Sequence, residues 1–158
     1  MDKEQYIQIR NTISIDEISY GYRTVTLFSE NELDEEQLGY SANAITGEIL
    51  DEWKESLLVI GREDLLGEPL FTDLQIEELP VYTTNHGKGV WNPELVASSF
   101  KGFIDSLMEV YQVSNGRSYP AELECNPLPD KEREQVLKKI AELNGNALME
   151  FWESWFEA

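Results

Sequence analysis

Three apolar runs separated by short turns constrain the fold of this chain more than any other stretch of its sequence. Residues 57–60 have no polar alternation, which at this length indicates a strand that is buried on both faces. Residues 70–74 and 79–84 have the composition of two further strands. Gly61 and Gly67 bracket the first intervening segment and predict a turn, because glycine adopts positive φ without steric cost. Strands joined by turns this short are expected to be mostly antiparallel.

A helix is predicted to follow these strands. Residues 85–89 are predicted to form a polar turn, and Asn92, Pro93 and Glu94 then combine an N-cap side chain, a proline at the first helical position and an acid at the positive end of the helix dipole. We therefore expect the helix to begin at Pro93. Apolar residues then recur at the spacing of a helix that covers a sheet: Val96, Phe100, Phe103, Ile104, Leu107 and Tyr111.

The segments before this unit add to the sheet and carry many acids. They predict, in order, a short helix, a strand, an acidic turn or short helix, and a hairpin or bulged strand: residues 3–12, 22–28, 29–36 and 41–50. Ser29 or Asn31 is the expected cap of the acidic helix.

The last third of the chain predicts a long loop and two helices. Residues 113–129 contain three prolines and predict a loop that either includes a short strand near residues 121–124 or binds a partner. Asp130 is expected to cap a helix that runs to Leu143 and ends at Asn144-Gly145. A final helix from Asn146 is expected to pack its apolar face on the core through Leu148, Phe151, Trp152, Trp155 and Phe156.

Together these segments predict an α+β fold. Its sheet would be single, mostly antiparallel or mixed, with about five to six strands flanked by helices. The apolar fraction of 41% supports a packed core despite the high charge. We expect residues 1–158 to form a single domain.

Several motifs of the central stretch share their order and spacing with a known family. They are Ile60-Gly61 followed by Asp64 and Gly67, an aspartate on the next strand (Asp73), Pro80-Val81-Tyr82, Trp91, and Ala97 with Ser99, Phe100, Phe103 and Ile104. This pattern resembles the SUKH superfamily, which includes the Smi/Knr yeast cell-wall regulator domain, Syd and many bacterial immunity proteins. The resemblance implies a binding role without catalysis, most often the neutralisation of a cognate nuclease toxin.

The distribution of charge indicates what kind of partner the protein binds. The net charge is −19, and residues 30–78 hold 15 acids against 2 bases, whereas residues 79–121 hold 3 of each. Such a field repels phosphate backbones and anionic lipids, so we expect no direct binding of nucleic acid or membrane. It attracts a basic protein, although an acidic surface also simply keeps a protein soluble.

The acids of this block, together with two aromatic residues near the predicted turns, form the candidate partner-binding set. Its members are Glu30, Glu32, Asp34, Glu35, Glu36, Glu63, Asp64, Asp73, Tyr82 and Trp91. Asp64 and Asp73 match acidic positions of the family motif, but each has an alternative role as an acceptor of backbone N–H groups in the glycine turn. Tyr82 and Trp91 are suited to anchor an interface, and Trp91 has burial in the core as its alternative.

We find no catalytic constellation in the sequence. His86 is the only histidine, and no nucleophile motif such as G-x-S-x-G accompanies it. Cys125 is the only cysteine and is expected to be an ordinary loop or core thiol, so no disulfide or thiolate metal site is expected. The acidic pairs lack the spacing of a calcium loop. We therefore expect a protein that is not an enzyme and holds no cofactor.

The leading hypothesis is an immunity protein that neutralises a basic toxin, by resemblance a nuclease domain, through its acidic surface. The alternative is an intracellular regulatory or scaffolding module like the yeast cell-wall regulator domain. The sequence lacks a secretory signal and any apolar run near the roughly 20 residues that cross a bilayer, which predicts a cytoplasmic location. The oligomeric state stays open.

Overall fold

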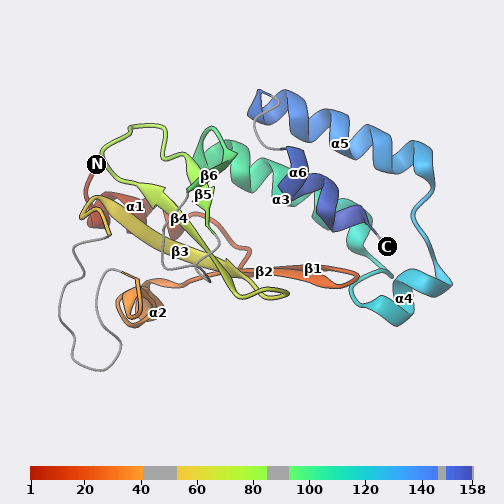
Figure 1. Cartoon of the computed structure of the whole chain (residues 1–158), viewed down its shortest axis with the longest axis horizontal. Helices are drawn as coiled ribbons and strands as arrows, with labels where there is room; N and C mark the ends of the chain where they lie inside the picture. Colours follow the sequence, from red (N-terminus) through yellow and green to blue (C-terminus); the bar gives the residue numbers. More distant parts are fainter. Residues whose placement is uncertain (41–52, 85–92, 146–148, 158) are drawn as a thin grey trace.

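A six-stranded antiparallel sheet forms the centre of the fold, in a computed structural model that describes residues 1–40, 53–84, 93–145 and 149–157 (Figure 1). The strands lie side by side in their order along the chain, so each pairs with the next. This confirms the predicted α+β class. The strands are β1 (Glu17–Tyr20), β2 (Arg23–Leu27), β3 (Leu57–Glu63), β4 (Glu68–Asp73), β5 (Val81–Thr83) and β6 (Glu94–Ala97).

The hairpin of β3 and β4 is the middle of this sheet, as the apolar runs predict. Leu58, Val59 and Ile60 are all buried, which confirms a strand covered on both faces. Strand β1 was not predicted separately. It pairs with β2 through the tight turn after Tyr20. The predicted hairpin within residues 41–50 and the polar turn at residues 85–89 lie outside the described residues.

Gly61 has a different role from the predicted one. It lies inside β3, which continues to Glu63, and the turn occupies only residues 64–67, with Gly67 at φ +70°. A Cβ atom on Gly61 would lie 2.4 Å from the backbone oxygen of Thr26 on β2. The glycine is therefore required for the close approach of two strands, and only Gly67 is required for the turn.

The two faces of the sheet differ in composition, because residues paired across neighbouring strands project to the same side. One face is mainly apolar and is covered by helices: Ile18, Tyr20, Val25, Leu27, Leu70 and Val81. Four polar residues share this face: Arg23, Glu63, Thr72 and Thr83. The other face is polar along the β1–β2 hairpin and aromatic over β4 and β5: Glu17, Ser19, Thr24, Thr26, Arg62, Phe71 and Tyr82. The layer of α3, α5 and α6 does not cover this second face (Figure 1).

Six α-helices and two short 3-10 helices complete the described structure, and no helix within it is long and apolar enough to cross a membrane. Figure 1 shows α3, α5 and α6 together on one side of the sheet, with α5 outermost. The helices are α1 (Lys3–Arg10), α2 (Glu30–Leu33), η1 (Glu35–Gln37), α3 (Phe100–Ser114), α4 (Pro120–Cys125), α5 (Asp130–Asn144), α6 (Met149–Glu153) and η2 (Ser154–Phe156).

The prediction that α3 begins at Pro93 is wrong. Glu94–Ala97 forms β6, which pairs with β5, and the helix begins at Phe100. Ser99 is its N-cap, since its Oγ accepts the Gly102 N–H at 2.9 Å. Three residues of this segment pair with β5, across one register shift, and this tertiary pairing overrides the local helix-start signal.

The apolar stripe of α3 is shifted relative to the prediction. Phe100, Phe103 and Leu107 are buried as expected, and Ile104 is half-buried. Tyr111 is instead 53% exposed, and Val110 takes the next buried position. From Leu107 the buried face continues through Val110 and Ser114, at spacings of three and four residues.

The C-terminal third is helical, and the predicted strand at residues 121–124 is wrong. These residues lie in α4, which has Pro120 at its first position and leaves Cys125 exposed. Helix α5 covers the predicted residues and is followed by Gly145 at φ +62°. The predicted cap is wrong: Pro129 holds the N-cap position, no side chain caps this end, and Asp130 is the first helical residue.

The final helices pack within the domain, as predicted. Trp152 and Trp155 are buried, and the Trp152 Nε1–H donates to the Val96 carbonyl of β6 at 3.0 Å. The last apolar face thus fastens the chain end to the edge of the sheet. Asn146 and Leu148 lie outside the described residues.

Candidate partner-binding surface

Helices α2 and η1 together form a short acidic platform that is attached to the sheet. Leu33 is 1% exposed and points into the core, whereas Glu30, Glu32, Asp34 and Glu35 are exposed. This confirms the predicted acidic helix after Ser29. Glu36 is half-exposed.

The start of α2 is fixed by hydrogen bonds to Glu32. Its carboxylate accepts the Ser29 backbone N–H at 2.8 Å and the Ser29 hydroxyl at 2.9 Å. These two hydrogen bonds hold the pKa of Glu32 below its ordinary value, and the bond from the backbone N–H has the larger effect. Glu32 is therefore partly committed to the cap.

Gln37 attaches the platform to the sheet. Strand β2 leaves β3 after the hydrogen bond from Phe28 N–H to the Ile60 carbonyl. At the next position, the Gln37 amide takes over the pairing: its Oε1 accepts the Val59 N–H at 2.9 Å, and its Nε2 donates to the Val59 carbonyl at 2.8 Å. The same Nε2 also donates to the Leu33 carbonyl at 2.8 Å. One side chain thus replaces a missing strand partner and holds η1 in place.

Replacement of Gln37 by alanine should destabilise the fold by about 2 kcal/mol, because it leaves the peptide groups of Val59 without a protein partner. We expect the loss in urea unfolding monitored by tryptophan fluorescence. Gln8→Ala, at an exposed position of α1, is the matched control and should change stability by less than about 0.5 kcal/mol. Equal stability of the two variants would show that water satisfies Val59 as well as Gln37 does.

Helix α1 lies beside α2 and runs in the opposite direction. Lys3, at the start of α1, forms an ion pair with Asp34, which follows the end of α2. At the other end, the Asn11 side chain donates to Glu30 at 3.2 Å. These two contacts bring the exposed acids of α1 next to those of the platform.

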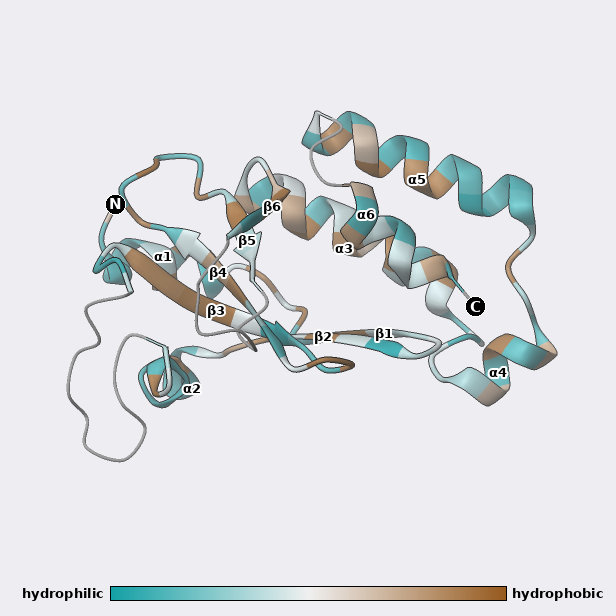
Figure 2. Ribbon diagram, in the orientation of Figure 1, coloured by the Kyte–Doolittle hydropathy of each residue, from teal (hydrophilic) through white to brown (hydrophobic). Residues whose placement is uncertain are grey.

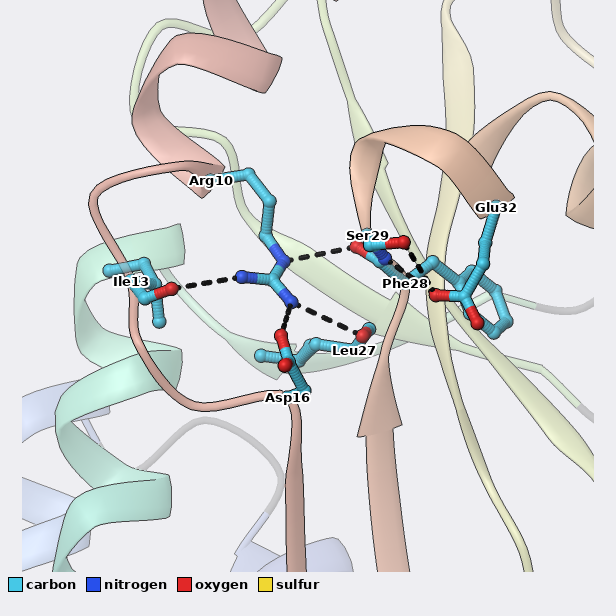
Figure 3. A network of polar contacts seen from close by, with 7 residues as sticks. All are labelled: Arg10, Ile13, Asp16, Leu27, Phe28, Ser29 and Glu32. Atoms are coloured by element: carbon cyan, nitrogen blue, oxygen red, sulfur yellow. Dashed lines mark hydrogen bonds and ion pairs between the residues drawn. The ribbon is translucent and has the colours of Figure 1, made fainter.

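A buried arginine fixes the junction below these helices (Figure 3). Arg10 is 4% exposed, and its guanidinium donates to the carbonyls of Phe28 at 3.0 Å, Ile13 at 3.1 Å and Leu27 at 3.3 Å. It also forms a 2.5 Å ion pair with Asp16. One side chain therefore joins the end of α1, the loop before β1 and the end of β2.

Strand β3 contributes a third part of the surface through Arg62. Its Nε donates to Asp64 at 3.0 Å, and its Nη1 lies 4.0 Å from the Glu36 carboxylate. The guanidinium carbon lies 5.9 Å from the centre of the Phe28 ring. Arg62 therefore links the turn after β3 to η1.

We call the exposed and half-exposed carboxylates joined by these contacts the acidic surface. Its members are Asp2, Glu4, Glu30, Glu32, Asp34, Glu35, Glu36 and Asp64. Its contacts bring in two cationic side chains, Lys3 and Arg62. By contrast, the outer helix α5 carries equal numbers of acids and bases: Asp130, Glu132, Glu134 and Glu142 against Lys131, Arg133, Lys138 and Lys139. The acidic surface is therefore strongly negative and α5 is balanced, while further exposed acids lie elsewhere on the described structure, such as Glu77, Glu78, Glu150 and Glu153.

Two acids of the predicted binding set are not on this surface. Glu63 is 1% exposed, accepts the N–H groups of Leu65 at 2.6 Å and Leu66 at 3.2 Å, and lies 3.8 Å from Arg23. The alternative role proposed for Asp64, as the acceptor within the turn, therefore belongs to Glu63. Asp64 is exposed and its carboxylate pairs with Arg62.

Asp73 is the second of these residues and is 7% exposed. It accepts the Gln75 N–H at 3.0 Å and pairs with Lys54 at 2.9 Å. Burial alone raises the pKa of Asp73, but the hydrogen bonds from Lys54 and Gln75 outweigh it, and the pKa lies below its ordinary value. Asp73 therefore has the alternative, structural role.

Tyr82 lies in a separate depression on the aromatic face of the sheet. Its ring stacks on Phe71 with the ring centres 5.7 Å apart, and it is half-buried. The depression has a volume of about 380 Å³ and is lined by Trp53, Lys54, Leu57, Phe71, Asp73, Tyr82 and Pro93. Trp91 and His86 lie outside the described residues.

The acidic surface has the chemistry of a docking site for cations carried on another macromolecule. In the part of the chain that the structure describes, no group of three or more His, Cys, Asp or Glu side chains is placed to hold a metal ion. A search against protein-family models, a search of curated proteins and a search of solved structures each found no match to this chain.

Proposed function

We propose that the protein is a stoichiometric binding protein similar to SUKH immunity proteins, and that it neutralises a cognate basic toxin with its acidic surface. The observation that carries the proposal is the concentration of carboxylates on α1, α2 and η1, in contrast to the charge-balanced and distant α5. A surface that binds nucleic acid is basic, and a dense set of carboxylates complements it. A nuclease domain is therefore the toxin class that fits best.

The rigid attachment of the acidic surface to the sheet also supports this role. Gln37 and Arg10 hold the helices to the sheet through hydrogen bonds to backbone groups. A pre-formed surface loses little conformational entropy when it binds, so more of the electrostatic attraction remains as affinity. The inhibitor would cover the active site or the substrate groove of the toxin. This inhibition requires no covalent reaction of the inhibitor.

Co-expression with the protein encoded by the neighbouring gene tests this function. We expect that protein to be basic, to arrest growth when expressed alone, and to lose this effect when the present chain is expressed with it. An inactivated form of the toxin serves as the control that growth arrest depends on its activity. If the neighbouring product arrests growth and the present chain neither restores growth nor forms a complex at low ionic strength, the proposal is wrong. A complex without any toxic activity would favour the regulatory module instead.

A further inference from the structure

The turn between β3 and β4 exposes two consecutive leucines at the tip of a hairpin. Leu65 is 50% exposed and Leu66 is 66% exposed. Figure 2 shows this tip as a hydrophobic end on a hairpin whose flanking residues are hydrophilic. Single exposed apolar residues are common on protein surfaces, but two adjacent leucines on a projecting turn are a candidate contact site. We call residues 64–67 the leucine turn.

The leucine turn is held in one conformation by a buried charge. The carboxylate of Glu63 accepts the N–H groups of both leucines, and the Asp64 N–H donates to the Thr24 carbonyl of β2 at 2.9 Å. Arg23 lies 3.8 Å from the Glu63 carboxylate and balances its charge. Burial of a carboxylate is unfavourable unless it is paired and hydrogen-bonded, and here both conditions are met. The leucines are thus presented by a rigid support.

The leucine turn is continuous with the acidic surface. Asp64, the first residue of the turn, pairs with Arg62, and Arg62 approaches Glu36 on η1. Protein interfaces typically combine a few apolar anchors with a charged and polar rim. An apolar anchor therefore lies beside such a rim. Leu65 adjoins Asp64, which pairs with Arg62, and Arg62 approaches Glu36.

We propose that Leu65 and Leu66 are the apolar anchor of the same interface, and that they enter an apolar pocket adjoining the cationic surface of the partner. The inference rests on the proposed function, because the acidic surface selects the partner. An anionic membrane is not the occupant, since the neighbouring carboxylates repel its head groups. A second copy of this chain would bring two acidic surfaces together, which like-charge repulsion disfavours.

The test compares two double variants for binding to the purified, inactivated toxin domain encoded by the neighbouring gene. Leu65→Ser with Leu66→Ser should weaken binding about 30-fold, because each half-exposed leucine has about half of its apolar area left to bury. The dependence of Kd on salt should stay as in the wild type, because no charge has changed. Tyr111→Ser with Tyr119→Ser removes equally exposed apolar side chains far along α3 and before α4, and should leave Kd unchanged. Melting temperatures show that both variants are folded.

The outcomes separate this inference from the proposed function. If the wild-type protein does not bind the toxin domain, the proposed function and the anchor fail together. If the wild type binds with a strong salt dependence and the leucine variant binds equally well, only the anchor is wrong. A wild-type dimer that the leucine variant converts to a monomer would assign the leucine turn to self-association and would also overturn the inference.

Discussion

Arg10→Ala should destabilise the protein by about 3–5 kcal/mol, the largest loss that we expect from a single substitution at a charged residue. The guanidinium of Arg10 satisfies three carbonyls, from Ile13, Leu27 and Phe28. Its removal leaves the buried carbonyls of Leu27 and Phe28 without this donor, and each unpaired buried group costs free energy. The Asp16 side chain is 73% exposed, so water can hydrate its carboxylate when the guanidinium is gone. The same deletion breaks the connection between α1, the loop before β1 and β2 (Figure 3).

Urea unfolding at neutral pH measures this effect directly. Lys101→Ala is the control, because Lys101 also pairs with an aspartate but its side chain is 85% exposed. That variant should lose less than about 0.5 kcal/mol, as exposed helix pairs usually do. A loss below about 1 kcal/mol for Arg10→Ala would mean that water replaces the guanidinium, and the network would then not be what fixes the junction.

The core of the sheet could be predicted from sequence because its signals are local. Residues 57–60 have no polar residue, and the return strand follows after a glycine, so a hairpin is the simplest arrangement. Helix α5 ends at Asn144, where the Asn144-Gly145 pair predicted a helix end. Such features depend on neighbouring residues along the chain, and tertiary contacts only reinforce them.

The start of α3 and the role of Glu63 could not be predicted in the same way. Asn92-Pro93-Glu94 is a strong helix start by local rules, but pairing with β5 makes Glu94–Ala97 a strand. The buried acceptor of the turn is Glu63, one residue before the aspartate that turn statistics favour, because the pleat of β3 directs Glu63 inward. Both outcomes depend on strands that are distant in sequence.

The acidic surface was partly predictable, and its supports were not. The run from Glu30 to Glu36 is visible in the sequence as an acidic helix, and it is exposed in the structure. Gln37 and Arg10 carry no local signal for the contacts that attach the helices to the sheet, since Val59 and Phe28 lie 22 and 18 residues away from them. The leucine turn did have a signal: two consecutive leucines between glycines, in a segment too short to bury them.

The second large effect is expected from neutralisation of the acidic surface. Four exposed members whose side chains make no cap hydrogen bond are replaced together: Glu30→Gln, Asp34→Asn, Glu35→Gln and Asp64→Asn. If each carboxylate contributes about 0.7 kcal/mol to the complex at low ionic strength, Kd should rise about 100-fold. Most of the loss should appear in the association rate, because long-range attraction steers the encounter.

A variant with the same change in net charge provides the control. Glu124→Gln, Glu132→Gln, Glu134→Gln and Glu142→Gln neutralise four exposed acids on α4 and α5, at the other end of the molecule. Screening over about 10 Å at 0.1 M salt makes these distant charges nearly irrelevant to the interface. The comparison therefore separates a local surface from an effect of total charge.

The most direct test of the account is the salt dependence of binding to the inactivated toxin domain of the neighbouring gene, measured for these two variants and the wild-type protein. We predict that the wild type and the α4–α5 variant bind equally tightly and weaken together as salt increases. The variant of the acidic surface should bind about 100-fold more weakly at low salt, with a much shallower dependence on salt. Equal affinities and equal salt slopes for the two four-fold variants would contradict the account, because the carboxylates on α2, η1 and the leucine turn would then have no special part in recognition.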